Sequence, residues 1–196
     1  MNKLLLTIGI TFLFTSCQKE LTSPPQTPVP IPAMEYSDYN DSTVKFGESI
    51  QLDIDKDGTI DFYFYTLLVG DAIEQKDKRQ YYIGSSLTAY CPVSNKENFP
   101  NVAKGENIGS DRYANYTWCD VIGVVLAQKV IAMQLPEYWE GDWKNACHRY
   151  MPLFVIKNGA KYFGWLEISF DQQAQGMVIH KAAISKEPNK EVRAGM

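Results

Sequence analysis

The chain has 196 residues, 45% of them hydrophobic and 13% aromatic, and a formal net charge of −4 at pH 7. This charge, with no cluster of Lys and Arg, argues against nucleic-acid binding, because proteins that bind nucleic acids carry basic patches. The length suits one domain with a hydrophobic core of its own.

The N-terminus has the character of an export signal. Lys3 supplies a positive charge, and the apolar segment 4–14 has about the length of a signal-peptide core, which is roughly 7–15 residues. It is too short for a transmembrane helix, which needs about 20 apolar residues. The segment ends in Phe14-Thr15-Ser16-Cys17 and not in an Ala-x-Ala site. An ordinary secretory signal with a coincidental cysteine is the alternative interpretation.

The sequence before and including Cys17 resembles the lipobox of bacterial lipoproteins, in the relaxed form common in the Bacteroidetes. The resemblance implies a signal peptide at 1–16, lipidation of Cys17 and a membrane as the first partner, because several acyl chains hold a protein firmly on a bilayer. The Pro-rich segment 17–33 then predicts an extended tether. We expect one domain at 34–196 in the cell envelope, anchored to the outer membrane, with its periplasmic or surface side left open.

Alternation of apolar and polar residues predicts β-strands along the domain. The predicted strands cover 44–54, 60–69, 80–90, 118–126, 130–135, 151–156, 162–170 and 177–184. A loop or one helical turn is predicted at 71–79, a long surface loop at 95–115, and a tight hairpin turn at Asn158-Gly159. Many short strands without a long helical period predict an all-β fold, an antiparallel β-sandwich that is jelly-roll-like and has long surface loops.

The stretch 52–64, LDIDKDGTIDFYF, carries the most specific chemistry. Counted from Asp53, carboxylates fall at positions 1, 3, 5 and 9, a glycine stands at position 6, and the carbonyl of position 7 is available. Calcium loops of the EF-hand type supply oxygens in this order. The residues concerned are Asp53, Asp55, Asp57, Thr59 and Asp61. A plain hairpin with an Asp-Gly turn is the alternative, but it accounts for only one of the four aspartates.

Position 12 of this loop is Phe64 where an EF-hand has a glutamate, and strands flank it where an EF-hand has helices. The pattern resembles the strand-loop-strand form D-x-D-x-D-G-x-x-D of integrin-type propeller repeats and many secreted bacterial β proteins. The resemblance implies that position 9, Asp61, binds the ion directly. We therefore predict a structural Ca²⁺ that fixes a hairpin.

The C-terminal segment 162–195 contains three pairs of residues, Gly164-Trp165, Ala182-Ala183 and Ala194-Gly195. The segment resembles the closing hairpin of uncharacterised secreted or anchored bacterial β-sandwich proteins. The resemblance implies a fold and no activity. For Gly164-Trp165 we expect a packing role, since a glycine gives a large ring room on a sheet.

Aromatic residues alternate with carboxylates at 137–143, which we interpret as a loop. Tyr138, Trp139 and Trp143 could stack on sugar faces, or the tryptophans could cap the end of the sandwich. Paired carboxylates could also serve a glycosidase, although nothing in this loop separates their environments. Ser42 lies in Asp-Ser-Thr, which resembles the O-glycosylation sequence of exported Bacteroidetes proteins; a polar linker is the alternative.

The remaining candidates for chemistry are three cysteines and two histidines after the signal segment. Cys91, Cys119 and Cys147 allow at most one disulfide, and the sequence does not choose the pair. His148 and His180 have no characteristic neighbours, so we predict no catalytic residue. The first interpretation is an anchored, calcium-stabilised binding or scaffold module whose partner is a glycan or an envelope protein. The alternatives are a carbohydrate-binding lipoprotein using the aromatic loop, and an envelope hydrolase.

Overall fold

The computed structural model describes residues 31–111, 113, 115–133 and 135–196, and the compact unit analysed below begins at Ile31. The expected signal peptide, Cys17 and nearly all of the expected tether lie outside the described residues. All regular structure in the described part is β-sheet. Within those residues, no helix has the length and apolar character to cross a membrane.

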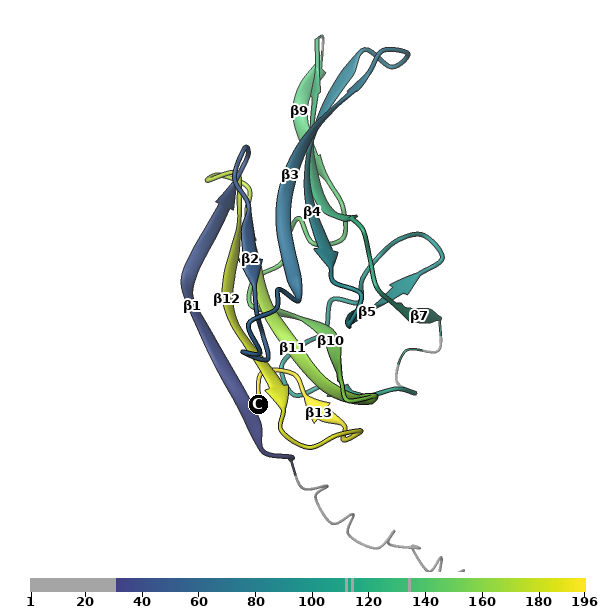
Figure 1. The fold of residues 1–196 in the computed structure, drawn as a ribbon. Helices are drawn as coiled ribbons and strands as arrows, with labels where there is room; N and C mark the ends of the chain where they lie inside the picture. Colours follow the sequence, from purple (N-terminus) through teal and green to yellow (C-terminus); the bar gives the residue numbers. More distant parts are fainter. Residues whose placement is uncertain (1–30, 112, 114, 134) are drawn as a thin grey trace, which may run out of the picture. The chain divides into compact units, whose positions relative to one another are not determined.

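The strands form two large antiparallel sheets and one small one (Figure 1). They are β1 (Met34–Lys45), β2 (Ile50–Leu52), β3 (Phe62–Asp71), β4 (Lys76–Ser85), β5 (Ala89–Ser94), β6 (Asn107–Ile108), β7 (Tyr116–Cys119), β8 (Val124–Ala132), β9 (Leu135–Glu140), β10 (Arg149–Lys157), β11 (Ala160–Asp171), β12 (Gly176–Ser185) and β13 (Val192–Arg193). The predicted all-β sandwich is confirmed.

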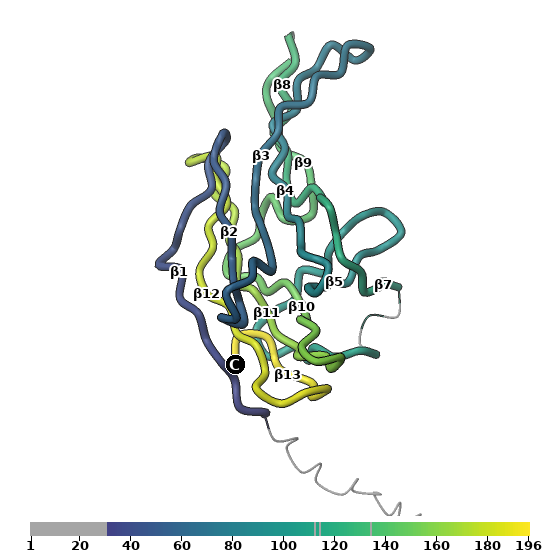
Figure 2. The backbone as a smooth tube through the Cα atoms, in the orientation of Figure 1, coloured from purple at the N-terminus to yellow at the C-terminus, as the bar shows by residue number. Residues whose placement is uncertain are grey.

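The six-stranded sheet has the order β1-β12-β11-β10-β5-β7. Its centre is the meander β10-β11-β12, and β1, from far earlier in the chain, lies beside β12 along its length (Figure 2). The sheet thus joins the first strand of the domain to a meander near its C-terminus. The five-stranded sheet β2-β3-β4-β8-β9 contains antiparallel neighbours joined in hairpins or by one longer connection.

The main hydrophobic core lies between the two large sheets. Alternate residues of the central strands enter it, as expected for strands that pack face to face. They include Leu52, Phe62, Phe64, Tyr81, Ile83 and Leu126 from the five-stranded sheet, and Met151, Leu153, Leu166, Ile168, Met177 and Ile179 from the six-stranded sheet. Each of these side chains is at most 1% exposed, so the contact between the sheets is dry.

A second core covers part of the outer face of the six-stranded sheet. Trp165 and Ala183, which are paired in register, lie at its centre, and Val192 and Ala194 of the C-terminal segment close over them. Val102 and Ile108 add further cover, and the short strand β6, which contains Ile108, pairs with β13. One residue of each pair of the C-terminal pattern, namely Trp165, Ala183 and Ala194, therefore lies in this second core, whereas Ala182 belongs to the main core. Trp165 is buried, as expected for a packing role, and Gly164 leaves room for the carbonyl of Ala183 on the next strand.

The central hairpins match the predicted strands closely, and several other regions differ. The sequence predicts no strand at 34–43, but this segment forms most of β1, an edge strand whose side chains are mostly polar. The predicted strands 44–54 and 80–90 each cross a turn and belong to two strands. The segment 137–143, expected as a loop, begins within β9 and pairs with β8. In each case, pairing with a neighbouring strand overrides the local composition.

Candidate metal centre

The aspartate loop connects β2 to β3, which are paired directly on either side of it. Its backbone turns tightly, with Lys56 at φ 57° and Gly58 at φ 90°. Gly58 suits this position because a side chain is strained at positive φ. The loop therefore closes a hairpin whose strands contribute to the main core. Its aspartates lie between the buried Leu52 and the buried Phe62.

Three of the predicted carboxylates converge. One oxygen each from Asp53, Asp55 and Asp61 can be chosen so that all lie within 4.8 Å of one another. Asp55 and Asp61 are buried and Asp53 is half-buried. Three carboxylates at this spacing repel one another unless a cation or a proton compensates them, and Ca²⁺ takes such oxygens as ligands.

The loop backbone orients these carboxylates. Oδ2 of Asp61 accepts hydrogen bonds from the N–H groups of Ile54 at 2.8 Å and Asp55 at 3.4 Å. The two oxygens of Asp53 accept from Asp57 at 3.2 Å and Gly58 at 2.9 Å. Each carboxylate is thus fixed from one side by the chain, which leaves its remaining lone pairs for another partner.

Holding the three carboxylates this close together without a cation is electrostatically unfavourable. Burial raises the pKa of Asp61 from 3.8 to about 6; the N–H of Ile54 opposes the shift, and the charges of Asp55 and Asp53 add to it. Oδ2 of Asp55 is buried and has no hydrogen-bond partner. The Lys157 ammonium lies 3.0 Å from this oxygen, as an ion pair without hydrogen-bond geometry. The charge of Lys157 and the raised pKa of Asp61, which makes its protonation easier, are therefore the local compensation.

One of the predicted ligands takes a different position. Asp57 is exposed, and its Oδ1 accepts from the N–H of Thr59 at 2.7 Å, which shapes the turn. Asp57 does not belong to the convergent group of carboxylates. The residues that fit a divalent cation are the buried or half-buried Asp53, Asp55 and Asp61, and Oδ2 of Asp55 has the Lys157 ion pair but no hydrogen-bond donor.

The aromatic residues predicted as a sugar platform separate in the structure. Trp143 is 2% exposed and lies in the main core. Trp139 packs partly against the same core, with its ring 5.0 Å from that of Phe170 between centroids. Only Tyr138, at 37%, is exposed. Because a sugar can stack only on a ring that solvent reaches, the predicted platform of three residues is not formed.

The other predicted positions lie apart from the metal centre. Ser42 is a half-buried residue of β1 whose hydroxyl donates to the carbonyl of Tyr39. Cys91 lies directly opposite Cys119 in the β5–β7 ladder, while Cys147 is exposed. All three are free thiols. The structure thus selects a pair that the sequence left open.

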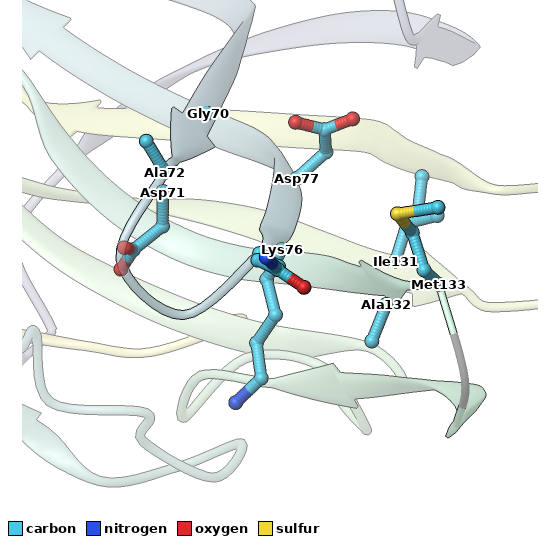
Figure 3. A pocket seen from close by; sticks show the side chains of 9 residues that line it. Gly70, Asp71, Ala72, Lys76, Asp77, Ile131, Ala132 and Met133 are labelled. Carbon is cyan, nitrogen blue, oxygen red and sulfur yellow. The ribbon is translucent and has the colours of Figure 1, made fainter.

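A groove lies at the far end of β3 from the aspartate loop (Figure 3). It is formed where the β3–β4 turn meets the end of β8. Its lining comprises Gly70, Asp71, Ala72, Gln75, Lys76, Asp77, Ile131, Ala132 and Met133. None of the predicted site residues lines it, so the groove and the candidate metal centre are separate features.

Comparisons with known proteins do not identify a relative. No family model matches the chain, and neither the curated proteins nor the solved structures contain a match. The arguments about function therefore rest on the residues alone. Sequence reasoning also missed that the ring of His148, just before β10, stacks on that of His180 in β12. It likewise missed the contact of His180 with Asp41, which lies 139 residues earlier in the chain.

Proposed function

We propose that this protein is a calcium-stabilised β-sandwich of the cell envelope, anchored at a membrane through lipidated Cys17 and acting as a binding or scaffold module. The single observation that supports the metal site is that one carboxylate oxygen each from Asp53, Asp55 and Asp61 lie within 4.8 Å of one another. The anchor rests on the sequence Phe14-Thr15-Ser16-Cys17 and the Pro-rich segment that follows it.

In this proposal the ion is structural. The loop joins two paired strands, and the residues next to it, Leu52 and Phe62, are buried. A cation among the three carboxylates would remove their mutual repulsion and hold β2 on β3, which share only three registered residue pairs. Binding to the native state alone stabilises it by mass action.

The test is a calcium titration of the purified, chelator-treated protein, followed by calorimetry and thermal unfolding together. We expect heat of binding and a rise in Tm in the parent, and neither in D55N/D61N. Asp171→Asn is the matched control, because Asp171 also accepts two backbone N–H groups in a hairpin turn, at 2.8 and 2.9 Å, but has no carboxylate cluster. A parent protein that shows neither heat of binding nor a rise in Tm at millimolar calcium would refute the metal proposal.

The anchor is tested by metabolic labelling with a fatty acid. We expect the label on the parent protein and not on C17A.

Glycan binding is a second candidate, supported by residues other than those predicted. Tyr63, Tyr65 and Tyr82 form a row on the outer face of the five-stranded sheet, with centroid distances of 6.1 and 5.1 Å. The ring of Tyr63 lies against Gly84, where an added Cβ would be 2.2 Å from it, so one face of the ring rests on the backbone.

A chain of polar groups continues this row. Gln80 donates to Gln128, which donates to Glu140, both at 2.6 Å. Rings beside amide and carboxylate groups suit sugars, which offer apolar faces and hydroxyls. Titration with neutral hexasaccharides should give saturable binding that Y63A/Y82A abolishes while the Tm with calcium is retained; W143F, a change in the core, should not affect it. Equal binding by both variants would remove this candidate.

A further inference from the structure

The outer face of the six-stranded sheet carries a polar cluster beyond the edge of the second core. His180 of β12 lies between two partners: its Nδ1 is 2.6 Å from Oδ1 of Asp41, and its Nε2 is 2.7 Å from Oγ of Ser169. His180 is 8% exposed, whereas the side chain of Asp41 is 76% exposed. Two hydrogen bonds thus link a carboxylate, an imidazole and a hydroxyl in a row near the surface of the domain.

The protonation states of this row follow from its chemistry. An ionised carboxylate can only accept, so Nδ1 of His180 carries the proton that Asp41 binds. Nε2 is then the acceptor, and Ser169 donates its hydroxyl proton to it. The hydrogen bond from His180 also lowers the pKa of Asp41, which keeps that carboxylate ionised. This arrangement matches the roles of the carboxylate, base and nucleophile in serine hydrolases.

Three strands and an irregular backbone build the cluster. Asp41 lies in a bulge of β1, where the register with β12 shifts between Asp38 and Ser42. Its φ is 54°, in the left-handed region. A bulge re-aims side chains and strained φ values concentrate at functional sites. Without the bulge, alternation along β1 would not have brought this carboxylate to His180.

A second histidine supports the first. The ring of His148 stacks on that of His180, with centroids 4.3 Å apart and planes at 24°. Its Nδ1 lies 2.8 Å from Oε1 of Glu167, and its backbone N–H donates to Oγ of Ser169 at 2.8 Å. His148 has φ 47°, a further strained residue in the same cluster.

These contacts position the hydroxyl of Ser169. Its proton points to Nε2 of His180, one lone pair accepts the N–H of His148, and one lone pair is left for a reacting carbon. The His148 side chain is 61% exposed, so the cluster faces solvent and is open to a molecule from outside. If the cluster served only to hold β1 on β12, the hydroxyl of Ser169 would not need to be oriented by both His180 and His148.

We propose that Ser169, His180 and Asp41 form a hydrolytic site for carboxylic esters, with Ser169 as nucleophile and His180 as general base. Asp41 holds the tautomer of His180, and His148 is a positioning residue that orients the ring of His180 and the hydroxyl of Ser169. This activity is independent of calcium binding and goes beyond the binding or scaffold role proposed above.

The reaction balances without a cofactor. Oγ of Ser169 forms a bond to the ester carbonyl carbon while its proton passes to Nε2 of His180. The bond from carbon to the alcohol oxygen then breaks, and His180 returns the proton to the leaving alkoxide. Water attacks the acyl-enzyme, gives its proton to His180 and releases the carboxylic acid, and Ser169 regains the proton. The sum is ester plus water giving acid plus alcohol.

The openness of the site defines the substrate class. Asp41 and His148 are both exposed, so a bulky alcohol part can extend into solvent. Charged groups lie beside the cluster, among them Glu167 and Lys181, and these disfavour a long apolar acyl chain. The site therefore suits a short acyl group, such as acetyl, carried on a larger polar alcohol.

The test measures hydrolysis of p-nitrophenyl acetate and labelling by a fluorophosphonate, both on the full-length protein. We expect turnover and stoichiometric labelling in the parent, and S169A should lose labelling and about 100-fold or more of the rate, because the nucleophile is removed. H180Q should lose about as much, since general-base catalysis contributes about 10²–10⁴-fold. Ser49→Ala, at an exposed serine between β1 and β2, should change neither readout.

Unfolding is distinguished from lost chemistry by the near-UV circular dichroism of each variant, which S169A should retain. H148Q reports on positioning: it should lower kcat while labelling persists and should change the pH profile. A parent that neither hydrolyses the ester nor reacts with the probe would overturn the proposal. So would an S169A variant that keeps the parental rate, because the hydrolysis would then come from another group.

Discussion

Nζ of Lys157, on β10, lies 3.0 Å from Oδ2 of Asp55, in the loop between β2 and β3, and the Asp55 side chain is fully buried. The pair joins the six-stranded sheet to the aspartate loop. Lys157 therefore compensates part of the negative charge of this loop, and the proposed cation would compete with it for the same carboxylate.

Replacing Lys157 by methionine leaves the buried charge of Asp55 without its partner. We expect K157M to lose roughly 1–3 kcal/mol of unfolding free energy without calcium, since an unpaired buried charge is costly and this lysine is partly exposed. With saturating calcium the loss should shrink. Chemical denaturation with and without calcium measures both values. Lys161→Met is the control, because Lys161 lies over the Phe154 ring and contacts no carboxylate; an equal calcium effect in both variants would contradict the competition.

The pH dependence of stability follows from Asp61. Its pKa is raised by burial from 3.8 to about 6 in the native state, so the native state holds more protons than the unfolded state between these values. Stability of the calcium-free protein should therefore fall as pH rises from about 4 to about 6, and calcium should reverse this fall because it favours the ionised carboxylate. Unfolding at intervals across this range, with D61N as a variant that lacks the effect, measures it. A calcium-free profile that rises with pH would be inconsistent with the raised pKa.

Cys91 and Cys119 should form a disulfide under catalysed oxidation. Directly opposite residues of antiparallel strands have Cα atoms about 4.5–5.5 Å apart, inside the range that a disulfide spans. Burial raises the pKa of the Cys91 thiol, so uncatalysed oxidation should be slow. The bridge should add about 2–4 kcal/mol of stability. Mass spectrometry after peptide mapping should find it in the parent and in C147S but not in C119S. A bridge to Cys147 in the parent would disprove the assignment.

Gly164 should tolerate no side chain. A Cβ at this residue would lie 2.3 Å from the carbonyl oxygen of Ala183 on the next strand. We expect G164A to lose about 1–3 kcal/mol or more, because the strands β11 and β12 must separate or distort. Thermal unfolding measures the loss. Gly70→Ala is the matched strand control, since its Cβ would be at an ordinary 3.5 Å from Asp77; similar losses in both variants would show that strand propensity and not this contact is responsible.

The sequence predicted those parts of the molecule that depend on neighbours along the chain. The hairpin at Asn158 and Gly159 has positive φ at both residues, as its turn type requires. The aspartate spacing also identified the three carboxylates that converge. Asp57 differs because its side chain serves the turn by binding the N–H of Thr59.

Tertiary contacts decide the parts that the sequence did not reveal. Trp143 enters the core because Gly141, at φ 101°, lets the chain approach β8 more closely than a side chain would allow, with an added Cβ 2.5 Å from the carbonyl of Leu126. Asp41 and His180 meet only because a bulge in β1 re-aims one of them. Neither the glycine contact nor the bulge produces a periodic signal in a single sequence.

The pairing of β1 with β12 determines when the domain can fold. Ser37 is registered with Ala182, so 145 residues (182 − 37) must be available before this edge of the sheet can form. Contacts of such sequence separation form slowly and late. During synthesis the first strand therefore waits, without its partner, until nearly all of the domain has emerged.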